Sequence, residues 1–211
     1  MCSSDLLAAE GAGRSIELLG EKDLAVVIPV DSAAHPLSDG LVAVGPNRAT
    51  LASAARRVTS AGGGIFCYTG LAAAWQMLGD SPVGQRHVIL FADAADAEEP
   101  GEYRTLLEKM TAGKCTVSVI GLGTENDVDA AFLRDIAARG GGRIFFSDRA
   151  ADLPALFQME TATVARSAFI EEPAPVKGTP GWFEIAAAPL DWPAAVDAYN
   201  LVYLQIGRAH V

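Results

Sequence analysis

RHVILFADAAD at residues 86–96 and TVSVIGLGTENDVDAAFLRDIAARGGGRIFF at residues 116–146 are the stretches that decide the fold. The first stretch contains the apolar run HVILFA at 87–92. The second begins inside the run CTVSVI at 115–120. Continuous apolar runs are typical of parallel strands that are covered on both faces. A stretch of helical periodicity follows each run, so the sequence predicts an α/β fold with a mostly parallel sheet between two layers of helices.

The chain on either side of these stretches continues the alternation of short strands and amphipathic helices. Asn47 is expected to cap a helix, Val128 is expected inside one, and Trp75 and Phe132 are expected to anchor the core by their spacing. Further strands are expected at residues 24–30, 41–44 and 143–147. Helices are expected at residues 7–19, 47–60, 71–78, 103–112, 128–139 and 153–165.

Composition excludes several classes of protein. Half of the 211 residues are hydrophobic, which is enough for one sizeable core, and the formal net charge of −10 excludes a nucleic-acid role. No apolar run reaches the roughly 20 residues that span a bilayer. Cys2, Cys67 and Cys115 form no CxxC pair, so neither a disulfide nor a zinc site is expected.

The two ends of the chain carry a signal of their own. Residues 206–211 (IGRAHV) match the translation of a common sequencing adapter, and residues 1–6 (MCSSDL) match its reverse complement with an initiating GTG read as Met. We therefore expect both segments to be adapter-derived, to pack against nothing, and to belong to a fragment of a longer natural protein. Residues 171–205 are expected to be a Pro/Gly-rich linker and the start of a truncated following domain.

Four segments, in their order, resemble a von Willebrand factor A (vWA) domain of the bacterial membrane-associated type. They are LAVVIPVDSAAH at 24–35, AGGGIFCYTGLAAA at 61–74 and the two stretches quoted first. The resemblance begins at the family's first helix and implies a doubly wound, Rossmann-like domain over residues 7–170. It also implies that the family's first, central strand is missing, and that its place lies between the strands around Val26 and Ile89.

The resemblance implies a metal-ion-dependent adhesion site (MIDAS), in which oxygen ligands hold Mg²⁺ and an open position accepts a partner's carboxylate. Asp93 matches the family's Asp at the end of the central strand, although an Asp there also caps loops. Ile65 stands where a Thr is expected, and Thr69, one helical turn later, is the remaining candidate ligand, with helix capping as its alternative role. The DxSxS segment would precede Leu7, so we expect Mg²⁺ in the intact protein but none in this fragment.

The acidic cluster after that strand has two possible roles. It could attract a cation, but a solvated loop before a helix is the expected one; its members are Asp93, Asp96, Glu98 and Glu99.

The resemblance implies a module that binds a protein partner, is not an enzyme, and is tethered to a bacterial membrane through segments absent from this fragment. The alternative is a regulatory part of an enzyme with a downstream glutamine-amidotransferase-like domain, but no nucleophile motif follows Glu171. GLGTEN at 121–126 lacks the last Gly of a dinucleotide loop. His35 and His87 have no nucleophile beside them in the sequence, and His87 is expected to be exposed or capping.

Overall fold

The computed structural model describes residues 3–59, 65–81, 85–94, 97–98, 100–165, 169–170, 173–176, 194–197 and 199–200. The chain divides into two compact units, Met1–Ala165 and Arg166–Val211. In the first unit the helices are α1 (Ser3–Leu18), α2 (Val44–Arg56), α3 (Cys67–Leu78), α4 (Tyr103–Ala112), α5 (Ala130–Arg139) and α6 (Leu153–Ala165), with a 3-10 turn at Ala150–Asp152.

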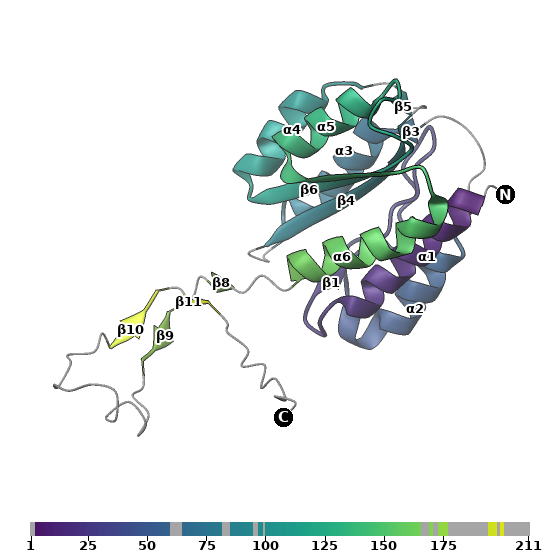
Figure 1. The fold of residues 1–211 in the computed structure, drawn as a ribbon. Coiled ribbons are helices and arrows are strands. Elements are labelled where there is room, and N and C mark those ends of the chain that lie inside the picture. The colour runs from purple at the N-terminus through teal and green to yellow at the C-terminus, as the bar shows by residue number, and fades with distance from the viewer. Residues whose placement is uncertain are drawn as a thin grey trace, which may run out of the picture. The chain divides into compact units, whose positions relative to one another are not determined.

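A parallel sheet forms the centre of the first unit. Its order is β4 (Arg86–Asp93), β6 (Cys115–Leu122), β7 (Gly141–Ser147), with Arg86 opposite Cys115 and Asp93 opposite Leu122. Helices α3, α4 and α5 cover one face of the sheet, and α1 and α6 cover the other (Figure 1). The predicted doubly wound α/β architecture is confirmed.

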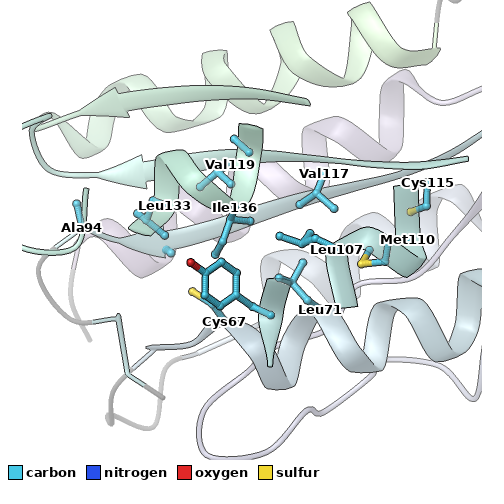
Figure 2. Packing of buried hydrophobic residues seen from close by; sticks show 13 residues of the cluster. Cys67, Leu71, Ala94, Leu107, Met110, Cys115, Val117, Val119, Leu133 and Ile136 are labelled. Atoms are coloured by element: carbon cyan, nitrogen blue, oxygen red, sulfur yellow. The ribbon is translucent and has the colours of Figure 1, made fainter. Parts of the chain in front are cut away.

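Strand β6 organises the core because its side chains alternate between the two helical layers. Val117 and Val119 point into the larger cluster, where Leu71 of α3 and Leu107 of α4 pack against them (Figure 2). Ile120 points the other way and packs against Leu153 and Phe157 of α6. The predicted core residues Trp75 and Phe132 are partly buried against the larger cluster.

The segment around the strand expected at residues 24–30 is less regular than expected. Only β1 (Leu24–Ala25) pairs, antiparallel, with β2 (Val42–Ala43). The strand expected over residues 24–30 is therefore too long, because residues beyond Ala25 form single contacts with a returning loop in place of a ladder: Leu37 N–H donates to Val27 O and His35 N–H to Pro29 O.

The starts of helices α2 and α5 differ from expectation. Helix α2 begins at Val44, so Asn47 is not its cap; its side-chain amide donates to Ala43 O inside the first turn. Pro46 accounts for the earlier start because proline suits the first turn of a helix, where its missing N–H is not needed. Helix α5 begins at Ala130, and Val128, expected inside it, lies in the preceding loop with 80% of its surface exposed.

Helices α1 and α3 each begin four residues before the expected start. Helix α1 includes Ser3–Leu6, and Leu6 is half-exposed. Helix α3 starts at Cys67, directly after the two-residue strand β3 (Ile65–Phe66), which pairs in parallel with β5 (Ala97–Glu98). The adapter origin of residues 1–6 and 206–211 stays a prediction, since residues 206–211 lie outside the described residues.

The second unit contains two short antiparallel ladders among its described residues. Strand β8 (Phe169–Ile170) pairs with β11 (Tyr199–Asn200), and β9 (Ala174–Pro175) pairs with β10 (Ala195–Val196). The predicted Gly-rich loop at 61–64, the acidic positions 96 and 99, and most of the predicted linker lie outside the described residues.

A cavity of about 950 Å³ separates β4 from residues 24–30. Within the described part of the chain, β4 pairs with β6 alone, so its other edge faces this cavity. The cavity lies between Val26 and Ile89, where the sequence analysis expects the missing strand.

Candidate functional site

Asp93 lies at the carboxyl end of the sheet, as expected. It is the last residue of β4 and is half-buried. Directly after it, Ala94 is fully buried, and its N–H donates to Leu122 O over 2.8 Å. Open α/β sheets bind ligands outside the carboxyl ends of their strands, so Asp93 stands at the position such a site requires.

The loop that follows β6 brings two more carboxylates to the same edge. Asp129 N–H donates to Ala94 O over 2.8 Å, which ties residues 123–129 to the end of β4. Asp127 accepts hydrogen bonds from the backbone N–H and the hydroxyl of Thr124, at 2.7 and 3.0 Å. Gly123 has a φ of +124°, and a Cβ there would collide with Asp127 Oδ2, so glycine is required.

Asp127 and Asp129 are site residues that no sequence-based prediction names. The signal was available: Asp93, Asp127 and Asp129 all follow apolar strands that are neighbours in one parallel sheet. The backbone hydrogen bond from Asp129 to Ala94 holds the loop against β4, and it joins residues 35 positions apart.

Helix α3 begins at this edge, because β3, which leads into it, pairs with β5 just beyond Asp93. Cys67, its first residue, is buried, and burial together with the nearby charge of Asp129 raises the pKa of its thiol to about 12. A thiol with that pKa is protonated at neutral pH, so Cys67 is not an activated nucleophile.

Thr69 is the third residue of α3 and is half-buried. The helix N-cap is Phe66, which forms no side-chain capping bond, so the capping role considered for Thr69 is wrong. Asp93 and Thr69 therefore come from two elements, β4 and α3, that meet the same edge of the sheet.

The described side chains do not fit a complete metal site. Across the described ranges, no three His, Cys, Asp or Glu side chains come together to hold an ion. Asp127 already accepts two hydrogen bonds from Thr124, and the hydrocarbon side chain of Ile65 provides no ligand oxygen. We derive no chemical step through a metal.

A second polar cluster joins α6 to the sheet. Ser118 Oγ, fully buried, donates to Glu160 Oε1 over 2.6 Å and accepts the backbone N–H of Arg143 over 2.9 Å. Glu160, also buried, forms an ion pair with the Arg143 guanidinium, and its Oε1 lies 3.4 Å from His87 Nε2.

His87 belongs to this cluster, and the expectation that it is exposed or capping is wrong. Its side chain is only 10% exposed, and Nδ1 lies 2.7 Å from Thr116 Oγ1. Burial lowers its pKa, partly opposed by Glu160. Because Ser118 donates to Glu160 and not to His87, the cluster is not a serine–histidine pair; it fastens α6 onto β4, β6 and β7.

The comparisons with known proteins concern the fold. The structure is similar to a von Willebrand factor type A protein from Catenulispora acidiphila, with a TM-score of 0.68 and 24% identity over 78% of this chain. The chain spans 39% of the length of that protein. It is also similar to BatB from Bacteroides thetaiotaomicron, with a TM-score of 0.61 and 14% identity, covering 76% of this chain and 87% of BatB.

A third similar structure is proximal thread matrix protein 1 from the mussel byssus, with a zinc-occupied MIDAS motif. Its TM-score is 0.60 at 17% identity, covering 75% of this chain and 40% of that protein. No family model matches the sequence, and no curated protein matches it. The first unit thus has a vWA fold, and identities this low carry the fold alone.

Among the described residues, none of the helices combines the length and the apolarity that crossing a bilayer requires.

Proposed function

We propose that this chain, whose first unit has the vWA fold, is a protein-interaction module that engages its partner at the carboxyl edge of the sheet. The observation that carries the proposal is Val128, a large apolar side chain that is 80% exposed in the loop between β6 and α5. Val128 lies at the carboxyl ends of the strands, outside which open α/β sheets bind their ligands.

Val128 is held rigidly. Its neighbours on both sides are fastened, Asp127 to Thr124 and Asp129 to the end of β4. Little conformational freedom is therefore lost when a partner covers the side chain, which favours binding. The flanking carboxylates of Asp127 and Asp129 favour a partner surface that presents an apolar pocket with basic groups around it.

The metal belongs to the intact protein in this proposal. The family resemblance supports a Mg²⁺ site completed by Asp93 and an added DxSxS segment, with Thr69 as the remaining ligand candidate. The replacement of the expected Thr by Ile65 supports a weakened site. The zinc in the mussel protein is compatible with a divalent ion in the fold but concerns that protein.

We also propose that the module serves a larger bacterial membrane-associated protein and does not itself catalyse a reaction. One of the similar structures is described as an aerotolerance-related membrane protein from Bacteroides fragilis, at a TM-score of 0.56 and 14% identity. The alternative is a regulatory part of an enzyme with a downstream glutamine-amidotransferase-like domain, which a nucleophilic Cys or Ser beside a partner His would favour.

The test is selection of binders from a random peptide library displayed on phage, with the chain as bait. Binders are then compared on Val128→Ser and on Met159→Ser, which changes a half-exposed apolar side chain on α6. We expect the selected binders to lose more than about tenfold affinity for Val128→Ser, because the contact of one buried aliphatic side chain contributes roughly 1.5–3 kcal/mol. Equal binding to both variants contradicts the proposal.

A further inference from the structure

Strand β7 is the outer strand of the parallel sheet, on the side away from β4, and among the described residues it pairs with β6 alone. Phe145 packs in the cluster under α6, and Ile144 and Phe146 pack against the larger cluster on the other face. Both faces of β7 are therefore covered, yet none of its seven residues is fully buried. The exposure that remains lies at the open edge of the strand.

The hydrogen bonds of β7 show which backbone groups face that edge. Arg143 N–H donates to Ser118 Oγ of β6, and Ser147 O accepts the N–H of Gly123, directly after β6. Because neighbouring residues of a strand direct their backbone groups to opposite sides, Ile144 and Phe146 direct theirs to the open edge. Within the described part of the chain, neither forms a backbone hydrogen bond beyond the sheet.

The open edge is protected over only part of its length. Sheets usually guard such an edge with a bulge, a proline or charged side chains, because unpaired backbone groups attract other strands. In β7 the register shift opposite Val117 and Val119 is one such irregularity, and it precedes Ile144. From Ile144 to Ser147 the strand reads IFFS and contains neither a proline nor a charge.

Two arginines flank this unprotected part. The guanidinium of Arg143 lies 5.5 Å from the centre of the Phe145 ring, and that of Arg134 on α5 lies 5.3 Å from the centre of the Phe146 ring. Neighbouring side chains of a strand point to opposite faces of the sheet. One cation therefore lies beside the edge on each face.

Both guanidiniums have donors to spare. Arg143 contacts Glu160, and Arg134 contacts Glu125; among the described residues, each of these contacts uses Nη2. The two arginine side chains are 44% and 41% exposed. A guanidinium has five N–H donors in a fixed fork, so Nε and Nη1 of each can bind a further carboxylate.

We propose that the open edge of β7 binds an extended, acidic segment of another protein, which adds to the sheet as a further strand. A peptide backbone provides donors and acceptors at the spacing that Ile144 and Phe146 require, and this mode of recognition is β-strand addition. Consecutive side chains of the added strand fall on opposite faces of the sheet. Two consecutive carboxylates in a β-branched segment therefore meet Arg143 on one face and Arg134 on the other.

The formal net charge of −10 does not prevent this contact. At physiological ionic strength, charges separated by more than about 8 Å are largely screened. The inference also goes beyond the proposed function, because the open edge of β7 and the exposed side chain of Val128 are different surfaces. Failure of binding at one leaves the other unaffected.

The probe is a fluorescently labelled synthetic peptide, TVTEEVTV. It is titrated into the complete 211-residue chain, at a concentration without light scattering, and into the same chain with a designed apolar strand and a short loop ahead of Met1, which covers the other edge of the sheet. We expect saturable binding of equal affinity. Hydrogen exchange at the amides of Ile144 and Phe146 should slow about tenfold at a peptide concentration of ten times Kd. Binding to the unaltered chain alone would place the peptide at β4 and overturn the proposal.

Three control peptides separate the contributions of charge and backbone. The peptide with both glutamates changed to glutamine should bind about three- to tenfold more weakly, because two exposed ion pairs are lost. Two further peptides carry N-methyl groups on alternate amides, in one or the other register. We expect one register to bind more than about tenfold more weakly and the other to bind unchanged, since only one set of amides faces β7. Equal binding of the two methylated peptides overturns the proposal.

The protein variants are matched in pairs. Ile144→Pro removes an N–H at the open edge, while Ile144→Ala loses a similar side chain and keeps the N–H; we expect only the proline variant to lose binding. Arg134→Gln should weaken binding about two- to fivefold.

Its control is Arg104→Gln, which changes an exposed arginine beside the Tyr103 ring on α4 and should have no effect. Val128→Ser should also bind the peptide unchanged. Equal affinity of the proline and alanine variants, or loss of binding in Val128→Ser, overturns the proposal.

Discussion

The Ser118 hydroxyl donates a 2.6 Å hydrogen bond to Glu160 Oε1 across the interface between β6 and α6, with both side chains fully buried. The same oxygen of Ser118 accepts the Arg143 backbone N–H, so one hydroxyl satisfies groups from two other elements. Ser118 therefore links β6, β7 and α6 through one hydroxyl.

Ser118→Ala should lower the free energy of unfolding by about 1–3 kcal/mol, because it leaves a buried carboxylate oxygen and a backbone N–H without this partner. Urea denaturation measures the change in a version of the chain that carries a designed apolar strand ahead of Met1, so that unfolding is cooperative, and the variants of His87 and Gly123 are compared in the same version. The control is Thr163→Ala on α6, whose hydroxyl is exposed and bonds only to Met159 O, and which should change stability by less than about 0.5 kcal/mol. Equal effects of the two substitutions contradict the structural role given to Ser118.

His87 should make stability depend on pH below neutrality. Burial lowers its pKa in the folded protein, and Glu160 on α6, Arg143 on β7 and Thr116 on β6 face it. The unfolded chain takes up a proton near pH 6.5 while the folded protein does not, so stability is present above that pH and is lost as pH falls through the window below it.

The measurement is the urea midpoint between pH 7.5 and pH 5. The carboxyl groups with lowered pKa, Glu10, Asp31 and Asp135, lose their contribution only at lower pH. We expect His87→Gln to weaken the dependence of the urea midpoint on pH between pH 5 and 6.5. If the slope in that window is the same in His87→Gln, another group is responsible.

Gly123→Ala should destabilise the carboxyl edge by about 1–3 kcal/mol, because a φ of +124° disfavours a side chain and the added Cβ meets Asp127 and Ala94. Gly40→Ala is the matched control, since a Cβ there has nothing within 4 Å. Thermal melting compares the two variants. A smaller effect at Gly123 than at Gly40 would show that the loop does not close as described.

The chain should not bind Mg²⁺ appreciably, because Ile65 removes one expected ligand and the described residues do not complete a site. Isothermal titration at millimolar Mg²⁺ tests this. Saturable binding that disappears in Asp93→Ala would contradict this prediction and show that Asp93 is a ligand of the ion.

The parts of the fold that the sequence predicts well are those determined by local pattern. Strands β4 and β6 extend only one or two residues beyond the predicted HVILFA and CTVSVI, because continuous apolar runs identify covered strands. Helices α4 and α6 also match, since their apolar spacing and terminal signals agree. Asn47 was misjudged because Pro46 beside it suits a first turn and outweighs the capping preference.

The sequence predicts only those site residues that a local pattern identifies. Asp93 could be found because it ends an apolar strand, which is a local signal. The burial of His87 could not be predicted, because the Glu160 that packs against it belongs to α6, more than 60 residues later. The place of Asp129 likewise depends on a backbone hydrogen bond to Ala94, which no local pattern encodes.

The cavity beside β4 makes the stability of the chain depend on what fills it. Val26 and Ile28 direct backbone groups toward the cavity, and the facing edge of β4 has no strand partner among the described residues. Each backbone group without a partner lacks the net stabilisation of a hydrogen bond, roughly 0.5–1.5 kcal/mol, against a stability of about 5–15 kcal/mol for a whole domain. Because the two walls have not closed on each other, the edge of β4 stays available for association between chains.

We therefore expect the chain on its own to associate and to melt without a sharp transition. The same chain with a designed apolar strand and a short loop ahead of Met1 should be monomeric, with a cooperative melt, because that strand pairs both walls. Size-exclusion chromatography with light scattering and calorimetry measure the two outcomes. A third version, whose added strand has aspartates at alternate positions, is the control, since the helices over the cavity would bury those charges. If the unaltered chain is already monomeric with a sharp melt, the cavity is not an unfilled strand position.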